Sequence, residues 1–328
     1  MAQPGHNTSL SLPARLLCYL GPPSIVLGVS YISPKTGLLA PLAFLPTAWA
    51  YKKWREANEV DPSRRAELEP MVWIYALTAT AGIAAVSALQ AGVGYGLATV
   101  LYGNGEGRKM FLQEAMRNTV TDLSPEIIKR RAELATSSRY IAFYVLTCFS
   151  AAGLGEEVLK LLPIIYESQR GTPEERKPRH RSYLDYVMAS SLAFGVVEVI
   201  GFFYSSCVSG KETGAKLALT VVERLALGSS GHVLMAVLSA LRATRRDYYD
   251  DTHLSWWRVL GPSVFVHGFF DTAALAFSAY EGNVGWIHPK GVVTTTVMLV
   301  MAASVWAGTA WMVWRELKII AAYDEKRK

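Results

Sequence analysis

Ionisable side chains lie inside apolar stretches of this chain, where a hydrocarbon environment penalises each of them. Seven such residues occur in four consecutive stretches: Glu156, Glu157, Lys160, Glu198, His232, His267 and Asp271. A charged side chain near the bilayer centre costs about 2.5–3.5 kcal/mol, so these groups must face one another or a wet cavity. Carboxylates can take a proton from water, and histidines can bind a metal ion or donate to an oxyanion. These residue types therefore point to hydrolysis.

The spacing of these residues favours one common site. Glu156 and Lys160 are four residues apart, as are His267 and Asp271, so each pair shares one face of a helix. At 1.5 Å per residue, Glu157, His232 and His267 lie about 14–15 Å from the cytosolic end of their stretches, and Glu198 lies about 22 Å deep. Given the uncertainty of the stretch ends, all four stretches place their polar groups in one layer.

The elements that must position this layer are predicted to be membrane-spanning helices. Of 328 residues, 51% are apolar and only 18% are charged, which excludes disordered and fibrous proteins. The three cysteines lie inside apolar stretches, which excludes a disulfide-stapled secreted domain. We predict an all-α polytopic bundle of about eight transmembrane helices: Leu16–Ile32, Gly37–Tyr51, Met71–Tyr102, Tyr140–Tyr166, Tyr183–Val208, Leu217–Leu241, Trp257–Tyr280 and Gly291–Trp314.

Lysine and arginine predict the orientation of the bundle. With eight spans, 19 basic residues fall on the side of the N-terminus and 10 on the other side, so both termini should be cytosolic. This bias accounts for the net charge of +6 without a nucleic acid partner. We divide the chain into residues 1–138, with the first spans and an interfacial amphipathic segment at 103–138; residues 139–280, a four-helix catalytic core; and residues 281–328, the last span and a basic cytosolic tail.

Four short motifs resemble those of one protease family. Residues 155–160 resemble the EExxK signature of the PrsW-type intramembrane proteases, in the wider clan of CaaX prenyl endopeptidases and bacteriocin-processing enzymes. Phe194–Glu198 matches the family's aromatic-xxx-Glu motif, Gly231–His232 its Gly-His motif and His267–Asp271 its HGxxD motif. All four occur in order on consecutive spans, and the resemblance covers Tyr140–Tyr280. The family often has Asn after the second-motif glutamate, where this chain has valine.

The resemblance implies a metallopeptidase of about eight helices that cleaves membrane-linked protein substrates. Carried over to this chain, it makes Glu157 the general base on water, with Glu156 orienting it or sharing a proton. Asp271 would orient His267, and Lys160 would neutralise the glutamate pair. A zinc ion, or the attacking water itself, would be held by three residues: Glu198, His232 and His267.

Two other functions stay open from the sequence. Residues 228–231 resemble the GxSG loop of rhomboid serine proteases, with Ser230 as the nucleophile and His267 as its base, but this leaves the carboxylates and Lys160 unexplained. The same helices could form a catalytically inactive membrane scaffold or a proton-coupled transporter, although no inverted repeat supports a transporter. The expected partners are a membrane protein substrate and the lipid bilayer, and the oligomeric state is left open.

Overall fold

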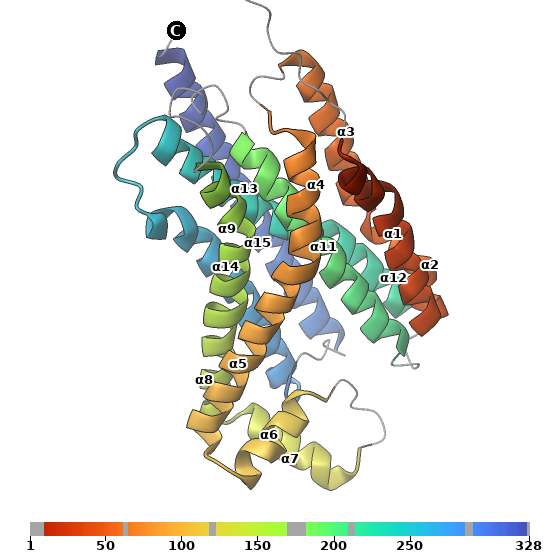
Figure 1. The fold of residues 1–328 in the computed structure, drawn as a ribbon. Helices are drawn as coiled ribbons and strands as arrows, with labels where there is room; N and C mark the ends of the chain where they lie inside the picture. Colours follow the sequence, from red (N-terminus) through yellow and green to blue (C-terminus); the bar gives the residue numbers. More distant parts are fainter. Residues whose placement is uncertain are drawn as a thin grey trace, which may run out of the picture. The chain divides into compact units, whose positions relative to one another are not determined.

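Helices make up all the regular structure in the described part of the chain. The computed structural model describes residues 10–61, 65–117, 123–168, 182–208, 214–285 and 291–326. Its elements within these ranges are all helical, which confirms the all-α class (Figure 1). Seven described helices are long and apolar enough to cross a membrane: Leu12–Ile32, Leu68–Tyr102, Ser138–Ser168, Ser182–Val208, Leu217–Tyr248, Trp256–Tyr280 and Val292–Lys326.

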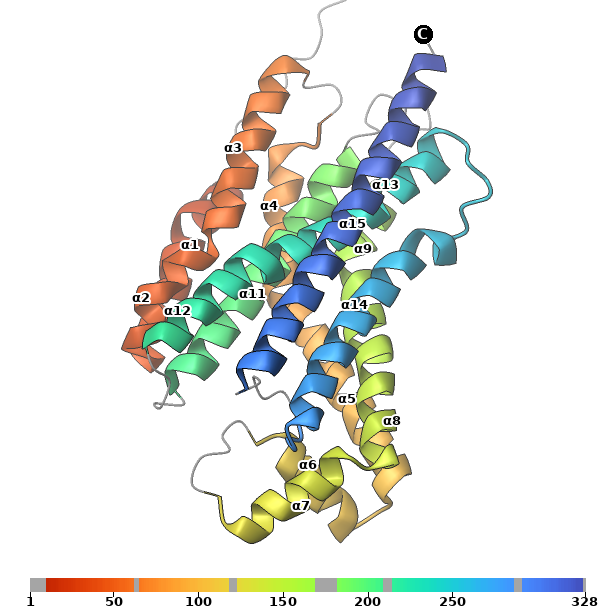
Figure 2. The same ribbon diagram turned by 180° about the vertical axis from the view of Figure 1, so that it is seen from behind.

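The expected second span is a pair of shorter helices. After α1 (Leu12–Ile32), the chain turns at Ser33, whose hydroxyl caps α2 (Pro34–Ala43), and α2 runs back beside α1 (Figures 1 and 2). Phe44 then separates α2 from α3 (Leu45–Val60), which has a proline in its first turn. Because proline has no N–H to donate, it begins a helix readily but interrupts a continuous one. The structure thus has seven long spans and one broken helical pair.

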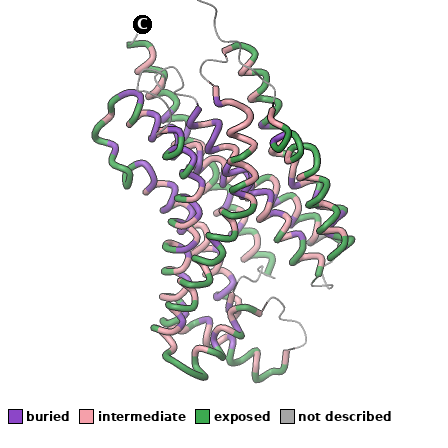
Figure 3. The backbone as a smooth tube through the Cα atoms, in the orientation of Figure 1, coloured by how far each residue is buried: buried purple, intermediate pink, exposed green. Residues whose placement is uncertain are grey.

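Contacts divide the chain into two units that interleave in sequence. The first unit comprises Met1–Ile83 and Lys160–Leu254. At its centre lies α11 (Ser182–Val208), which packs against α2, α3 and three further helices and is the most buried of the candidate spans (Figure 3). The further helices are α4 (Leu68–Leu77), α12 (Gly214–Glu223) and α13 (Ser229–Tyr248).

The apolar core of the first unit explains one departure from the family pattern. Val199, where the family often has Asn, is buried in a cluster with Ala43, Val196 and Phe203. A side-chain amide at this position would lose its hydrogen bonds to water without a polar neighbour from this cluster. Valine at position 199 therefore serves the packing of α11 against α2.

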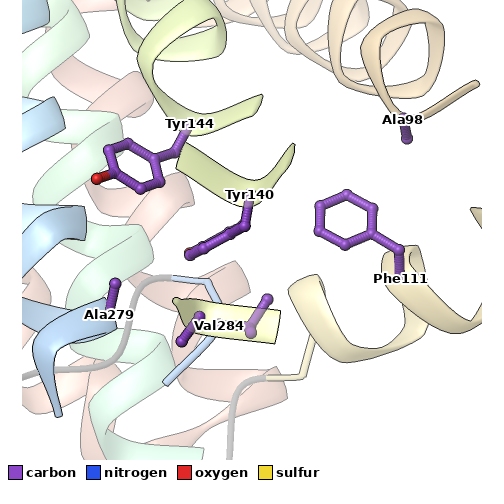
Figure 4. Packing of buried hydrophobic residues seen from close by; sticks show 7 residues of the cluster. Ala98, Phe111, Tyr140, Tyr144, Ala279 and Val284 are labelled. Atoms are coloured by element: carbon purple, nitrogen blue, oxygen red, sulfur yellow. The ribbon is translucent and has the colours of Figure 1, made fainter. Parts of the chain in front are cut away.

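The second unit comprises Ala84–Leu159 and Ser255–Lys328 and has a core of its own. Phe111 and Tyr140 pack there with Ala98, Ala279 and Val284 (Figure 4). This core joins two short helices, which we call the cap, to the ends of the long ones. The cap is α6 (Glu106–Ala115) and α7 (Pro125–Ala135); the long helices are α5 (Ile83–Tyr102), α8 (Ser138–Thr147) and α14 (Trp256–Tyr280). The last helix, α15 (Val292–Lys326), packs against α14.

A buried carboxylate ties the two cap helices together. Glu114 on α6 accepts hydrogen bonds from Arg117, Arg130 and Arg131, two of them at 2.8 Å. Arg131 also donates to the carbonyl oxygen of Val284 at 2.7 Å. Burial alone raises the pKa of Glu114, but the hydrogen bonds from the three arginines outweigh it and lower the pKa to about 2. The cap is therefore docked by charge as well as by apolar packing.

We expect Glu114→Gln to loosen the cap. The substitution leaves the buried Arg131 without its counter-charge, which costs about 3–5 kcal/mol for a buried pair. Thermal unfolding should occur at a lower temperature, and α6 and α7 should exchange amide hydrogens faster. The pKa of Glu114 is lower in the folded protein than in the unfolded chain. Its contribution to the free energy of unfolding is therefore fully present above the unfolded pKa and is lost as the pH falls toward 2.

Glu106→Gln is the matched control, because Glu106 is an exposed acid on the same helix. Equal unfolding temperatures and exchange rates for the two variants would contradict a structural role for the Glu114 cluster.

Candidate active site

Three of the expected site residues, Glu156, Glu157 and His232, follow segments of π-helix. The segment η3 (Cys148–Leu154) runs into α9 (Gly155–Ser168), which begins with the glutamate pair. The segment η5 (Arg224–Gly228) runs into α13, whose first turn carries His232. A π-helical turn holds one more residue than an α-helical turn, so it changes which side chains face a neighbour, and such segments are frequent at functional sites.

The first group of site residues surrounds His267 in the second unit. The Nδ1 atom of His267 lies 2.8 Å from Glu157 Oε1, and both side chains are buried. The Nε2 atom lies 3.5 Å from Glu156 Oε2 and 3.5 Å from Asp271 Oδ2. The side chain of Asp271 is 23% exposed and that of Glu157 only 1%, so Asp271 is the more open of the two. One imidazole thus faces three carboxylates.

Two glycines let the helices of this group touch. A Cβ atom added at Gly153 would lie 2.9 Å from the carbonyl oxygen of Val264 and 3.3 Å from the amide nitrogen of Gly268. A Cβ atom at Gly268 would lie 2.6 Å from the ring of Phe149. The segment η3 and α14 are therefore in contact backbone to backbone, which small residues allow in membrane helices. This approach brings His267 to Glu157.

The second group surrounds His232 in the first unit. Its Nδ1 atom lies 2.7 Å from Lys160 Nζ, and its Nε2 atom lies 2.7 Å from Glu198 Oε2. A lysine ammonium only donates, so Nδ1 accepts from Lys160 and Nε2 carries the proton that is donated to Glu198. The ring of Phe194 lies 4.9 Å from Lys160 Nζ and 5.3 Å from the imidazole centre. The aromatic residue of the second motif thus contacts both partners.

One helix contributes to both groups. The first turn of α9 carries Glu156 and Glu157 in the second unit, and Lys160 follows one turn later in the first unit. Pro163 lies inside the same helix. All seven residues expected from the sequence therefore belong to one group or the other, and α9 is common to both.

Two polar residues near these groups were missed in the sequence. Gln90 on α5 donates from Nε2 to Glu156 Oε1 at 3.0 Å. Arg224 is buried, with its guanidinium carbon 3.3 Å from the centre of the Phe202 ring, and its charge acts on the Glu198 carboxylate. The available signal was the same in both cases, a polar side chain inside an otherwise apolar stretch.

The donor atoms around His267 suit a metal ion such as zinc. Ligands of a tetrahedral zinc ion lie about 2.0–2.2 Å from the ion and hence about 3.3–3.6 Å from one another. The two 3.5 Å separations between His267 Nε2 and the carboxylate oxygens of Glu156 and Asp271 fall in this range. Three electron-rich atoms that approach this closely in a buried place favour a shared cation.

The comparison with protein families assigns the chain. The family model described as "PrsW family intramembrane metalloprotease" matches residues 72–307, well over half of the chain. The chain belongs to the PrsW family. Neither the curated proteins nor the solved structures gave a match.

Membership in the PrsW family settles the class of function. The protein is an integral membrane peptidase, and its family implies a metal ion and membrane protein substrates. The serine-protease, transporter and scaffold alternatives are not favoured. In the structure, the Ser230 hydroxyl donates to the carbonyl oxygen of Ala226 on its own helix.

We expect Gly153→Val to disable this PrsW-family protease by separating α14 from η3. The added side chain would overlap the backbone at Val264 and Gly268, so His267 would lose its hydrogen bond to Glu157. Bound metal, measured by mass spectrometry of purified protein, should fall together with the unfolding temperature. Gly96→Val on α5 is the control, because a Cβ atom there meets nothing within 4 Å. Normal metal content in Gly153→Val would contradict the importance of this close approach.

Proposed function

We propose that this PrsW-family protease hydrolyses peptide bonds of membrane proteins with a zinc ion held by Glu156 and His267 and, as the sequence resemblance implies, by His232. The observation that carries the proposal is the position of His267 Nε2, which lies 3.5 Å from Glu156 Oε2 while Nδ1 is held by Glu157. The three proposed ligands are buried residues, and glutamate and histidine are side chains of a type that zinc binds. When bound, a zinc ion polarises the scissile carbonyl and acidifies water.

We assign Glu157 the role of holding His267 in place. A ligating histidine usually donates its other N–H to a carboxylate, which fixes the direction of the ligating nitrogen. Glu157 lies where such a carboxylate is expected, 2.8 Å from Nδ1 of His267, whereas Asp271 lies 3.5 Å from Nε2. The resemblance implied that Asp271 orients His267 and that Glu157 is the general base, whereas the distances favour the exchange of these two roles.

Asp271 is then the group that takes the proton from water. Its partly exposed carboxylate lies beside His267 Nε2, where the reacting water would be bound. As the water oxygen bonds to the carbonyl carbon of the substrate, one proton passes to Asp271. The same proton passes on to the departing amine nitrogen when the C–N bond breaks, which restores the carboxylate.

Helix α9 carries residues of both groups, which supports a common role for them in the proposed activity. Glu156 and Lys160 are four residues apart on this helix and therefore share a face, and Lys160 is hydrogen-bonded to His232. Glu198 would act as the carboxylate that orients His232 through Nε2, although the sequence placed it among the ligands themselves. Residues 139–280 would then form the catalytic core.

The basic residues indicate on which side of the membrane the two termini lie. We propose that both termini are cytosolic, because the chain reverses between α1 and α2 and the eight-span count of basic loops therefore still applies. The basic loop at residues 169–181, on which part of this count depends, lies outside the described residues. The substrate would meet the active site within the bilayer.

Three variants separate the roles in the proposed mechanism. Asp271→Asn should keep zinc but lower cleavage about 10²–10⁴-fold, the usual contribution of a general base. His267→Ala should lose zinc and cleavage together, and Glu157→Gln should weaken zinc binding about 10–100-fold. The measurements are zinc content in detergent-purified protein and cleavage of a co-expressed single-span substrate that the wild type cuts.

His253→Ala is the control, because His253 is an exposed histidine in the loop before α14. Full cleavage by His267→Ala would contradict the proposed function, and loss of zinc in Asp271→Asn would make Asp271 a ligand rather than the base.

The contact between Lys160 and His232 predicts that removal of a site residue strengthens zinc binding. Lys160 donates to the lone pair of Nδ1, which is the only nitrogen that His232 has left for a metal ion. Removal of the ammonium in Lys160→Met should therefore strengthen zinc binding. A hydrogen bond with a charged group contributes about 1.5–3 kcal/mol, so the dissociation constant should fall about 10–100-fold.

Competition with a chromophoric chelator measures this constant in purified protein. Lys318→Met is the control, because this lysine lies over Trp314 on α15. Unchanged or weaker zinc binding in Lys160→Met would remove His232 from the proposed ligands.

A further inference from the structure

Gln90 is a polar residue with apolar neighbours on its helix. It belongs to α5, whose neighbouring residues Ala88, Leu89 and Ala91 are all apolar. A side-chain amide that enters such surroundings loses its bonds to water, so it requires a hydrogen-bond partner. For Gln90 that partner is Glu156, whose Oε1 accepts from Gln90 Nε2 at 3.0 Å.

A contact one residue earlier on both helices holds this pair in register. A Cβ atom added at Gly155 would lie 2.9 Å from Leu89 Cδ2, so glycine lets α5 approach the start of α9. Leu89 precedes Gln90, and Gly155 precedes Glu156. The hydrogen bond between Gln90 and Glu156 is therefore supported by packing next to it, and all four residues belong to the second unit.

The two oxygens of Glu156 have different neighbours. Oε1 accepts from Gln90, and Oε2 lies 3.5 Å from His267 Nε2. A carboxylate held by one oxygen has a fixed plane, so the direction of its second oxygen is fixed as well. Gln90 is uncharged and donates without neutralising the carboxylate, whereas lysine or arginine would compete with a cation for the same charge.

We propose that Gln90 is a positioning residue of the metal centre, which directs Glu156 Oε2 toward the ion that His267 binds. This inference rests on the proposed function, because it takes Glu156 as a ligand. Gln90 touches neither substrate nor metal; it acts through the carboxylate. Groups in this outer position typically change metal affinity 10–100-fold when they are replaced.

The test compares Gln90→Leu with Ser87→Ala, a control that removes a polar group from an exposed position of the same helix. Zinc affinity is measured by competition with a chromophoric chelator, and the visible absorption of the cobalt(II)-loaded protein reports the ligand arrangement. We expect Gln90→Leu to bind zinc about 10–100-fold more weakly, with an altered cobalt spectrum and an unchanged unfolding temperature. Ser87→Ala should match the wild type.

Gln90→Asn serves as the second variant, because it keeps an amide but withdraws it by one methylene group. It should show the same loss as Gln90→Leu, since its donor no longer reaches Glu156. Wild-type affinity and spectrum in both variants would overturn the role of Gln90 and leave the proposed function standing. Failure of the wild type itself to bind zinc or cobalt would overturn the metal centre and this inference with it.

Discussion

The imidazole of His267 is hydrogen-bonded to one carboxylate and lies 3.5 Å from two others, in a helix that crosses an apolar bilayer. An ionised acid without a partner is energetically costly inside a membrane. Each must therefore be brought to a partner by the helix that carries it. The close contact at Gly153 and Gly268 and the π-helical segments before the glutamates and before His232 all serve this requirement. The rest of the bundle can be understood as the support that keeps these helices in place.

The two units of this protein are stabilised by different kinds of interaction. The first is organised around the buried helix α11, where an apolar cluster extends from Val196 to Phe203. The second combines an aromatic core with the charged cluster at Glu114, which docks the cap on the ends of the long helices. Glu156, Glu157 and Asp271 thus belong to a unit that is stabilised partly by ion pairs, whereas Glu198 belongs to a unit that is stabilised by apolar packing.

The sequence predicted the helical class and indicated the seven candidate polar residues because each signal is local. A run of about 20 apolar residues needs no partner to be recognised, and a charge inside it is conspicuous. The break between α2 and α3 was harder to foresee, because a proline after ten residues can either kink a span or end it. The pairing of His267 with Glu157 rather than with Asp271 depends on backbone contact at two glycines, which spacing along one helix does not report. Gln90 was missed because its partner lies 66 residues away.

The proline inside α9 has a mechanical consequence. Pro163 cannot donate a hydrogen bond to the carbonyl of Leu159, and the boundary between the two units falls at that residue. The turn of α9 from Leu159 to Pro163, which includes Lys160, therefore lacks one backbone hydrogen bond. Lys160 is thus carried by a turn that bends more easily than an uninterrupted helix, one turn beyond the glutamates.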